Sequence, residues 1–314
     1  IQREPVLGLE FTENQLDAFT GHSIATMKKS YAIGLDGVLM PQYQQIVNDL
    51  NKLKKQRAQE KVHSLLALAS SNDNTEVIEA LSQLVSFVKN KGALPYYANI
   101  VNTLISLLQA NNDLLDPVWK VTRQILKKQP EIINPIVPLL ISKPRMTKQF
   151  DDTWLLSALA ELGGKNPLWI NEELQFIKDK LRSKKWNERR FAALAIGSIG
   201  SAEPSLVKEV IPVLISFATD PENVRKELDE TNYKQITTDS GLQFGLSIST
   251  SVSLEVAIWI RDACIDALGL IGKHSPESVN AAIPLLESLS KNAPSPYTVK
   301  KAIKALDAIR GQNV

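Results

Sequence analysis

Four prolines recur at a regular interval and indicate that this chain is built from repeats. Pro130, Pro167, Pro204 and Pro276 are separated by 37, 37 and 72 residues, and 72 is about twice 37. Each proline is followed by an apolar segment of helix length, a polar turn, and a second segment that is rich in small residues and ends in glycine. A chain with such a period folds into stacked helical hairpins. The pattern predicts an extended binding surface and no enclosed pocket.

The second segments can be superimposed residue by residue. They read WLLSALAELG at 154–163, FAALAIGSIG at 191–200 and ACIDALGLIG at 263–272. One shared position, a turn before the end, carries only small residues, namely Ala160, Gly197 and Gly269. We expect these residues to act as spacers that let the neighbouring helix approach closely. The final glycines are expected in a left-handed capping conformation, which glycine adopts without steric penalty; they are Gly163, Gly200 and Gly272.

The first segments share a proline of their own. Pro138, Pro212 and Pro284 occupy one repeat position inside apolar helical segments, which predicts a bent helix. With the arginines that lead the second segments, Arg189 and Arg261, the pattern over residues 93–311 resembles the HEAT-repeat family of armadillo-like α-solenoids. The resemblance implies an all-α fold, a right-handed α-α superhelix of about six helical hairpins. It also implies that the two arginines bond to acidic residues between repeats.

The repeat pattern divides the chain into an extension and a solenoid. Residues 1–40 carry no repeat signature and are interpreted as an N-terminal extension, and residues 41–314 as the solenoid. Within the solenoid, helices in 41–92 are expected to cap the stack, and 93–311 to form the repeats. The expected helices are 41–69, 75–89, 94–110, 114–128, 131–142, 151–163, 168–183, 186–200, 205–218, 254–271, 277–291 and 297–310.

An insertion at residues 221–253 accounts for the doubled interval. Its part from 233 to 253 is polar and rich in Ser and Thr, and a turn at 239–241 predicts a small hairpin. A long insertion in a regular array is either functional or disordered. Three interpretations stay open: residues 231–252 bind a partner or cover a pocket, pack onto their own solenoid, or are disordered. The candidate partner-binding residues of the insertion are Tyr233, Phe244, Leu246 and Ile248. Ile236 would share the apolar side of the predicted hairpin.

A basic run at residues 178–190 is the second candidate site. Seven cations lie within thirteen residues and are opposed only by Asp179 and Glu188. Lys143, Arg145 and Lys148 occupy the equivalent turn one repeat earlier, which predicts a positive edge that could hold an acidic peptide or a phosphate backbone. The alternative is a solvated turn with a buried tryptophan. The candidate binding residues are Lys184, Lys185, Trp186 and Arg190.

Enzymatic signatures are absent from the sequence. The three histidines are not followed by glutamate, and the chain has no Gly-rich phosphate loop, no G-x-S-x-G elbow and no HExxH motif. We therefore predict no catalytic residue, no cofactor and no metal. The apolar runs fall short of the ~18 residues that would predict a membrane span. A single cysteine, Cys264, excludes an internal disulfide and favours a reducing, cytoplasmic compartment, and its repeat position predicts a packed thiol.

These observations predict a binding protein. The favoured function is a non-enzymatic protein-protein interaction scaffold or adaptor, which grips a protein or peptide through the inner helices and the 231–252 insertion. The alternative is a nucleic-acid-binding solenoid that uses the basic edge near 178–190. Only the alternative predicts an affinity that falls steeply as salt rises. The pattern predicts no particular oligomeric state.

Overall fold

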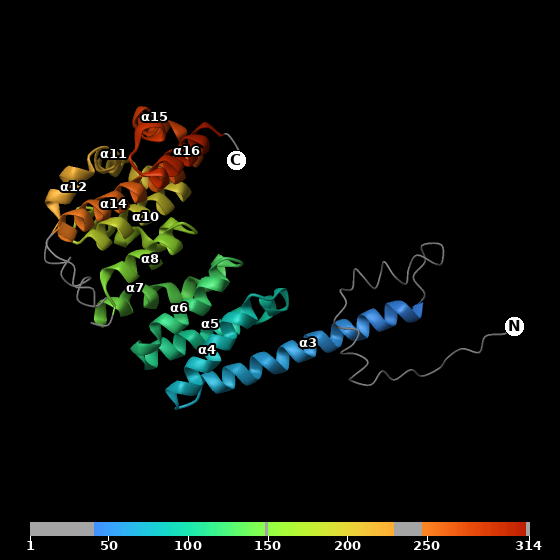
Figure 1. Ribbon diagram of the computed structural model, residues 1–314. Coiled ribbons are helices and arrows are strands. Elements are labelled where there is room, and N and C mark those ends of the chain that lie inside the picture. Colours follow the sequence, from blue (N-terminus) through green and yellow to red (C-terminus); the bar gives the residue numbers. More distant parts are fainter. Residues whose placement is uncertain (1–40, 148–149, 229–246, 312–314) are drawn as a thin grey trace. The chain divides into compact units, whose positions relative to one another are not determined.

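The protein is all-helical. The computed structural model describes residues 41–147, 150–228 and 247–311, and every regular element in these ranges is a helix (Figure 1). This confirms the predicted all-α class. The predicted extension at residues 1–40 lies outside the described residues. Internal contacts divide the chain into two compact units, the first ending at Tyr96 and the second beginning at Tyr97.

The first unit pairs a long helix with one about half its length. Helix α3 (Pro41–Ala69) packs against α4 (Asn74–Val88), and the 3-10 helix η1 (Lys91–Tyr96) contacts both. Asp73 begins α4 as its cap, because its carboxylate accepts a hydrogen bond from the Thr75 N–H at 2.7 Å. The buried side chains of the pair are Leu50, Val62, Leu65 and Ala69 of α3, and Val77, Ala80, Leu81, Leu84, Phe87 and Val88 of α4.

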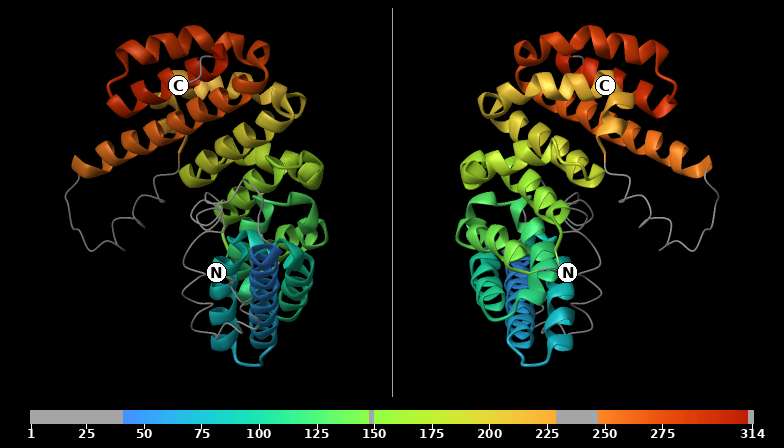
Figure 2. Two further views of the ribbon diagram at one scale, coloured as in Figure 1. Left: turned by 90° about the vertical axis from the view of Figure 1, so that its right-hand side faces the viewer. Right: turned by 90° about the vertical axis from the view of Figure 1, so that its left-hand side faces the viewer.

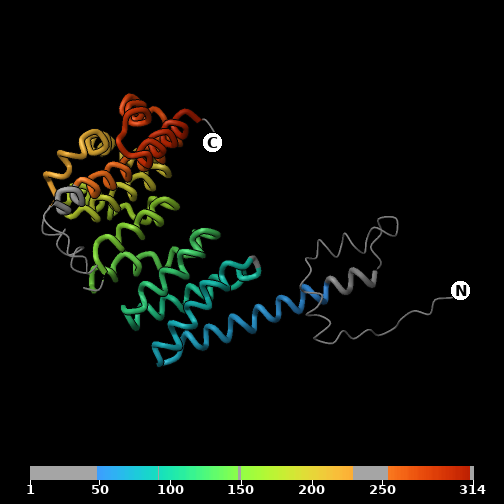
Figure 3. The backbone as a smooth tube through the Cα atoms, in the orientation of Figure 1, coloured from blue at the N-terminus to red at the C-terminus, as the bar shows by residue number. Residues whose placement is uncertain are grey.

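The second unit alternates split first helices with continuous second helices. Its elements are α5 (Tyr97–Ala110), η2 (Asn112–Leu114), α6 (Leu115–Leu126), η3 (Pro130–Ile136), α7 (Val137–Met146), α8 (Asp152–Gly163), η4 (Pro167–Glu173), α9 (Leu174–Lys180), α10 (Trp186–Ala202), η5 (Pro204–Val210), α11 (Ile211–Thr219), α12 (Pro221–Glu227), α14 (Ser247–His274), η6 (Pro276–Ala282), α15 (Ile283–Asn292) and α16 (Pro296–Arg310). Figure 3 traces the backbone through these elements. Apart from the start of α14, the predicted helices among them begin and end close to their predicted ranges.

The repeated prolines each begin a 3-10 helix of seven residues. Pro130, Pro167, Pro204 and Pro276 are the first residues of η3, η4, η5 and η6. A proline suits this position because its fixed φ matches the start of a helix and its missing N–H would have no helical partner. An α-helix follows each of these 3-10 helices directly.

The second set of prolines does not bend an α-helix from within. Pro138, Pro212 and Pro284 are the second residues of α7, α11 and α15. The change from 3-10 to α geometry takes place one residue earlier, so each proline lies in a first turn, where its missing donor breaks no helical hydrogen bond. The predicted bent helix is therefore two helical segments joined end to end.

The second helices pack against one another in chain order. Helix α10 contacts α8 and α14, and α14 contacts α16 (Figure 2). The spacer prediction is confirmed for both glycines at the shared position. A Cβ atom on Gly197 would lie 2.5 Å from the Cα atom of Ala267, and one on Gly269 would lie 3.0 Å from the Cα atom of Ala305. Only a residue without Cβ allows these backbones to approach so closely.

The glycines that end the second helices do not have the predicted left-handed conformation. Among the described glycines, only Gly311, which follows α16, has a positive φ. Gly200 instead provides space, because a Cβ atom there would lie 2.5 Å from Cγ2 of Val207 and 2.7 Å from Cγ1 of Ile271. Gly163 and Gly272 are crowded in the same way by an isoleucine of the following second helix. These glycines are required by packing between helices.

The insertion is helical at both of its described ends. Helix α12 occupies 221–227, and α14 begins at Ser247, so the helix predicted for 254–271 is longer than expected. Ile248 lies in the first turn of α14, which contradicts its predicted place in a hairpin. Tyr233, Phe244 and Leu246 lie outside the described residues, as does Ile236.

Candidate functional site

Ser183 organises the turn in which the basic run lies. This turn connects α9 to α10, and the Ser183 hydroxyl accepts a hydrogen bond from the Lys185 N–H at 3.1 Å. The same hydroxyl donates to the Glu188 carboxylate at 2.8 Å, and the Ser183 carbonyl accepts from Nε of Arg189 at 2.9 Å. The turn is therefore held in one conformation by bonds that involve the run's own charged residues.

Most of the cations in the run are neutralised by ion pairs with acidic residues of the protein itself. Four of the seven cations form ion pairs: Lys178 with Glu209, Lys180 with Asp152 and Glu188, Lys185 with Glu188, and Arg189 with Glu227. Of the rest, Arg182 and Lys184 are exposed, and Arg190 lies 5.6 Å from the Phe191 ring centre. None of these three forms an ion pair within the described residues. The run therefore presents three unpaired cations, where seven were expected.

The Glu188 carboxylate at the centre of these pairs predicts a pH-dependent stability. Burial alone would raise the pKa of Glu188, but hydrogen bonds from Lys180, Ser183 and Lys185 outweigh it and hold the pKa below its ordinary value. Such a carboxylate stabilises the fold above its unfolded pKa, and the contribution is lost as the pH falls through the folded pKa. We expect Glu188→Gln to destabilise the protein most at neutral pH and progressively less on acidification.

Urea unfolding of the wild type and Glu188→Gln over a pH series measures this difference. Glu172→Gln is the control, because Glu172 is exposed and its carboxylate forms no ion pair within the described residues. A stability difference for Glu188→Gln that does not change with pH would show that the carboxylate charge is not the cause.

The arginines that the family resemblance singled out are internal. Arg189 is only 2% exposed; its guanidinium contacts Glu227 at 2.9 Å and stacks on the ring of Phe217. Nη2 of Arg261 donates to the Thr298 hydroxyl at 2.9 Å, and that hydroxyl donates to Asp262 at 2.8 Å.

The two arginines differ in their acidic partner. The Arg189 partner, Glu227, lies in α12, 38 residues further along the chain, whereas Asp262 is the sequence neighbour of Arg261, and its Oδ1 atom lies 3.9 Å from Nε of Arg261. Burial raises the pKa of Asp262 and lowers that of Arg261.

The structure brings Trp186 of the basic run against Trp259 of α14. Their ring centres lie 5.4 Å apart, and Trp259 is 38% exposed. Trp186 itself is half-buried, so it serves α10–α14 packing as well as the surface. The sequence did not single out Trp259, because its partner is 73 residues away. Trp119 is buried and its ring contacts that of Trp154, which is half-exposed.

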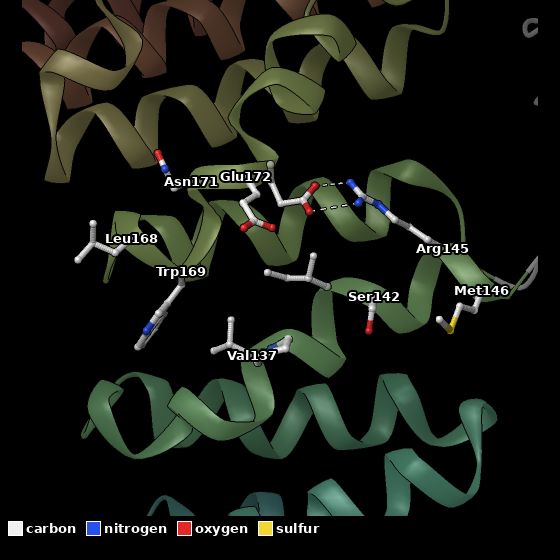
Figure 4. A pocket seen from close by; sticks show the side chains of 11 residues that line it. Val137, Ser142, Arg145, Met146, Leu168, Trp169, Asn171 and Glu172 are labelled. Carbon is white, nitrogen blue, oxygen red and sulfur yellow. Dashed lines mark hydrogen bonds and ion pairs between the residues drawn. The ribbon is translucent and has the colours of Figure 1, made fainter.

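A cleft between α7 and η4 is a site that sequence reasoning missed (Figure 4). It has a volume of about 630 Å³, within the range of pockets that hold small ligands or peptide side chains. Figure 4 shows Leu168 and Trp169 at one end and Arg145 and Met146 at the other. The lining residues are Val137, Pro138, Ile141, Ser142, Arg145, Met146, Leu168, Trp169, Asn171, Glu172 and Glu173.

Of the charged side chains at the cleft, Arg145 and Glu173 pair with each other, whereas Glu172 has no ion-pair partner within the described residues. Both terminal nitrogens of Arg145 donate to the two carboxylate oxygens of Glu173, a geometry that orients the guanidinium. Arg145 also lies 5.0 Å from the ring centre of Phe176. Glu172 is exposed and forms no ion pair within the described residues. The cleft therefore combines apolar side chains with one negative charge that is available at its rim.

Two large apolar side chains at the cleft are highly exposed. Leu168 is 83% exposed and Met146 is 73% exposed. Leu168 follows the proline that begins η4, where Asn166 caps the helix by accepting a hydrogen bond from the Leu168 N–H at 3.1 Å. This start places the Leu168 side chain on the outside of the turn. Met146 is the last residue of α7.

Comparison between the repeats provides the signal that could have found this cleft. The residue after the repeat proline is Glu131, Ser205 or Glu277 in the other three repeats, where Leu168 stands here. Met146 corresponds in the same way to polar residues, namely Ser183, Asp220 and Asn292. Because repeat packing requires neither apolar residue, these two departures from the repeat indicate a function other than stability.

The described ranges contain no candidate metal centre and no helix suited to cross a membrane. No group of three or more His, Cys, Asp or Glu side chains in these ranges could hold a metal ion, and none of their helices combines the required length and apolar character for a span. Cys264 is fully buried, and burial raises the pKa of its thiol. It packs as an apolar side chain, as predicted.

Comparisons with known proteins leave the family open. No protein-family model and no curated protein matches the chain. Among solved structures, two engineered proteins from the Northeast Structural Genomics Consortium are similar, each with 15% sequence identity and a TM-score of 0.45. They cover 80% and 79% of this chain, and the matches span 97% and 98% of the engineered chains. A likeness at this level assigns neither a family nor a function.

Proposed function

We propose that the second unit is a HEAT- or armadillo-like α-solenoid that acts as a non-enzymatic, cytoplasmic protein-binding scaffold. The repeat period and the successive contacts of α8, α10, α14 and α16 support the solenoid arrangement. The observation that carries the binding function is the pair of exposed apolar residues, Leu168 and Met146, on the two sides of the cleft. Large exposed apolar side chains that rim a concave surface are typical of protein-interaction sites.

The chemistry of the cleft defines the partner segment. Val137, Ile141 and Trp169 line the cleft with apolar surface that suits a leucine, methionine or aromatic side chain. Because Glu173 is neutralised by Arg145, the Glu172 carboxylate is the charge that a ligand meets. The partner is therefore a peptide segment that carries an apolar anchor next to a lysine or arginine. This assignment places binding on the first helices of the repeats, whereas the sequence favoured the inner helices.

A peptide selection tests this function. A random peptide library selected against the full chain should enrich apolar residues adjacent to Lys or Arg. The double variant Met146→Ser, Leu168→Ser should bind the selected peptides at least roughly 10-fold more weakly, because burial of each side chain contributes about 1.5 to 3 kcal/mol. Fluorescence anisotropy with the labelled peptides measures both affinities.

The matched control is Ile78→Ser, which removes another exposed apolar residue that does not line the cleft. It should leave the affinity unchanged. Peptides that bind the double variant and the wild type equally well would overturn the cleft as the binding site.

A further inference from the structure

One stretch of the first unit carries far more positive charge than the chain as a whole. Residues 52–61 of α3 contain five cations and one acid, Glu60, a net charge of +4, whereas the whole chain has +2. The remaining residues therefore sum to −2. The five cations are Lys52, Lys54, Lys55, Arg57 and Lys61.

This stretch lies outside the apolar contact between α3 and α4. Leu50 and Val62 are buried, and no residue between them is. Lys54 and Lys61, seven residues apart, lie on one side of the helix, and Lys52 and Lys55, three residues apart, lie on another. The stretch is a solvated basic rod of roughly 14 Å.

The neighbouring segment adds charge of the same sign. Residues 80–96, which comprise the second half of α4 and all of η1, contain no acid and add Lys89 and Lys91. The Tyr96 hydroxyl donates to the Lys55 carbonyl at 3.3 Å, which places the end of η1 beside the rod. We call residues 52–61 and 80–96 together the basic pole; it has seven cations and one acid.

The basic pole differs from the run at 178–190 in how many of its cations form ion pairs. In the run, four cations are held by acidic residues of the same unit. Four lysines of the pole are exposed and form no ion pair within the described residues; they are Lys52, Lys54, Lys55 and Lys61. Unpaired like charges on one short rod repel one another, which lowers stability. Because the four lysines are exposed, packing within the described residues does not offset this repulsion, and a ligand of opposite charge would relieve it.

We propose that the basic pole binds the phosphate backbone of a nucleic-acid duplex without reading its sequence. A duplex presents about one negative charge per 1.7 Å of axis, so the lysines on either side of the rod can face several phosphates at once. An anionic membrane fits less well, because a membrane-surface helix needs a broad apolar face. The apolar residues of the stretch are Leu53 and Ala58, and both are already partly buried. This activity is independent of peptide binding at the cleft.

Anisotropy titration of a labelled DNA duplex of roughly 20 base pairs with the full chain tests the proposal. Between 50 mM and 200 mM salt, the affinity should fall roughly 40-fold if three phosphates are contacted. The variant Lys52→Gln, Lys54→Gln, Lys55→Gln, Lys61→Gln should bind at least about 10-fold more weakly at 50 mM salt and show a shallower salt dependence. Circular dichroism checks that it remains folded, as expected for exposed substitutions.

The matched control removes the unpaired cations of the other candidate site with Arg182→Gln, Lys184→Gln and Arg190→Gln. Wild-type affinity in this control supports the basic pole. Loss of duplex binding in the control but not in the quadruple variant would move the site to the 178–190 edge and overturn the proposal. Tighter binding to poly-glutamate or to phosphatidylserine vesicles than to the duplex would overturn it as well, as would the absence of duplex binding at 50 mM salt.

Discussion

Gly197→Leu is expected to destabilise the second unit by at least about 3 kcal/mol. The Cβ atom alone would lie 2.5 Å from the Cα atom and 2.8 Å from the Cβ atom of Ala267. Because the nearest obstacle is backbone, no side-chain rotation relieves the clash, and α10 and α14 must move apart. The higher helix propensity of leucine recovers only about 1 kcal/mol of this loss. Urea unfolding followed by tryptophan fluorescence measures the effect, since all five tryptophans lie in the second unit.

The control for this prediction is Ala202→Leu at the exposed end of the same helix. It introduces the same leucine side chain at an exposed position and should change the stability by less than about 0.5 kcal/mol. Equal effects of the two substitutions would show that the approach of α10 to α14 does not depend on a residue without Cβ.

Arg189→Ala is expected to destabilise the second unit by about 2 to 4 kcal/mol. The guanidinium is 2% exposed, donates to the Ser183 carbonyl and to Glu227, and lies 4.8 Å from the ring centre of Phe217. The substitution removes two charge-assisted hydrogen bonds and leaves a cavity, whereas Glu227 is half-exposed and regains water. Urea unfolding measures the loss.

Arg182→Ala and Arg189→Met separate the causes of this loss. Arg182 belongs to the same basic run but is exposed, and its removal should change the stability by less than about 0.5 kcal/mol. Arg189→Met keeps most of the volume without the charge and should recover only part of the loss, because the Ser183 carbonyl stays unpaired. Equal effects of Arg182→Ala and Arg189→Ala would contradict a structural role for Arg189.

The helices could be predicted because their signals are local. Apolar spacing, the repeat prolines and the small-residue stretches are all recognisable within one or two turns. The predicted helices, apart from the start of α14, therefore begin and end near their predicted positions. The 3-10 geometry of the first segments was missed, since proline predicts where a helix starts but not its hydrogen-bond spacing. Gly163, Gly200 and Gly272 were misassigned because a helix-ending glycine suits a left-handed cap and close packing equally well in sequence.

The candidate sites were harder to predict from the sequence, because each depends on residues that lie far apart in the chain. The run at 178–190 looks like an open positive edge in sequence, yet its partners Asp152, Glu209 and Glu227 come from three other elements. The cleft pairs Met146 with Leu168 across two elements, and only comparison between repeats shows that both are unusual.

The sequence by itself determined the helical class, the period near 37 residues and the absence of motifs for catalysis, because these are properties of local spacing and residue type. The tertiary structure decided which charges are neutralised, which glycines touch a neighbouring helix, and which apolar side chains remain in water. The physical reason is the distance along the chain over which each interaction acts. Hydrophobic periodicity and helix starts act within a few residues, whereas ion pairing, steric exclusion and burial depend on atoms that the fold brings together from distant repeats.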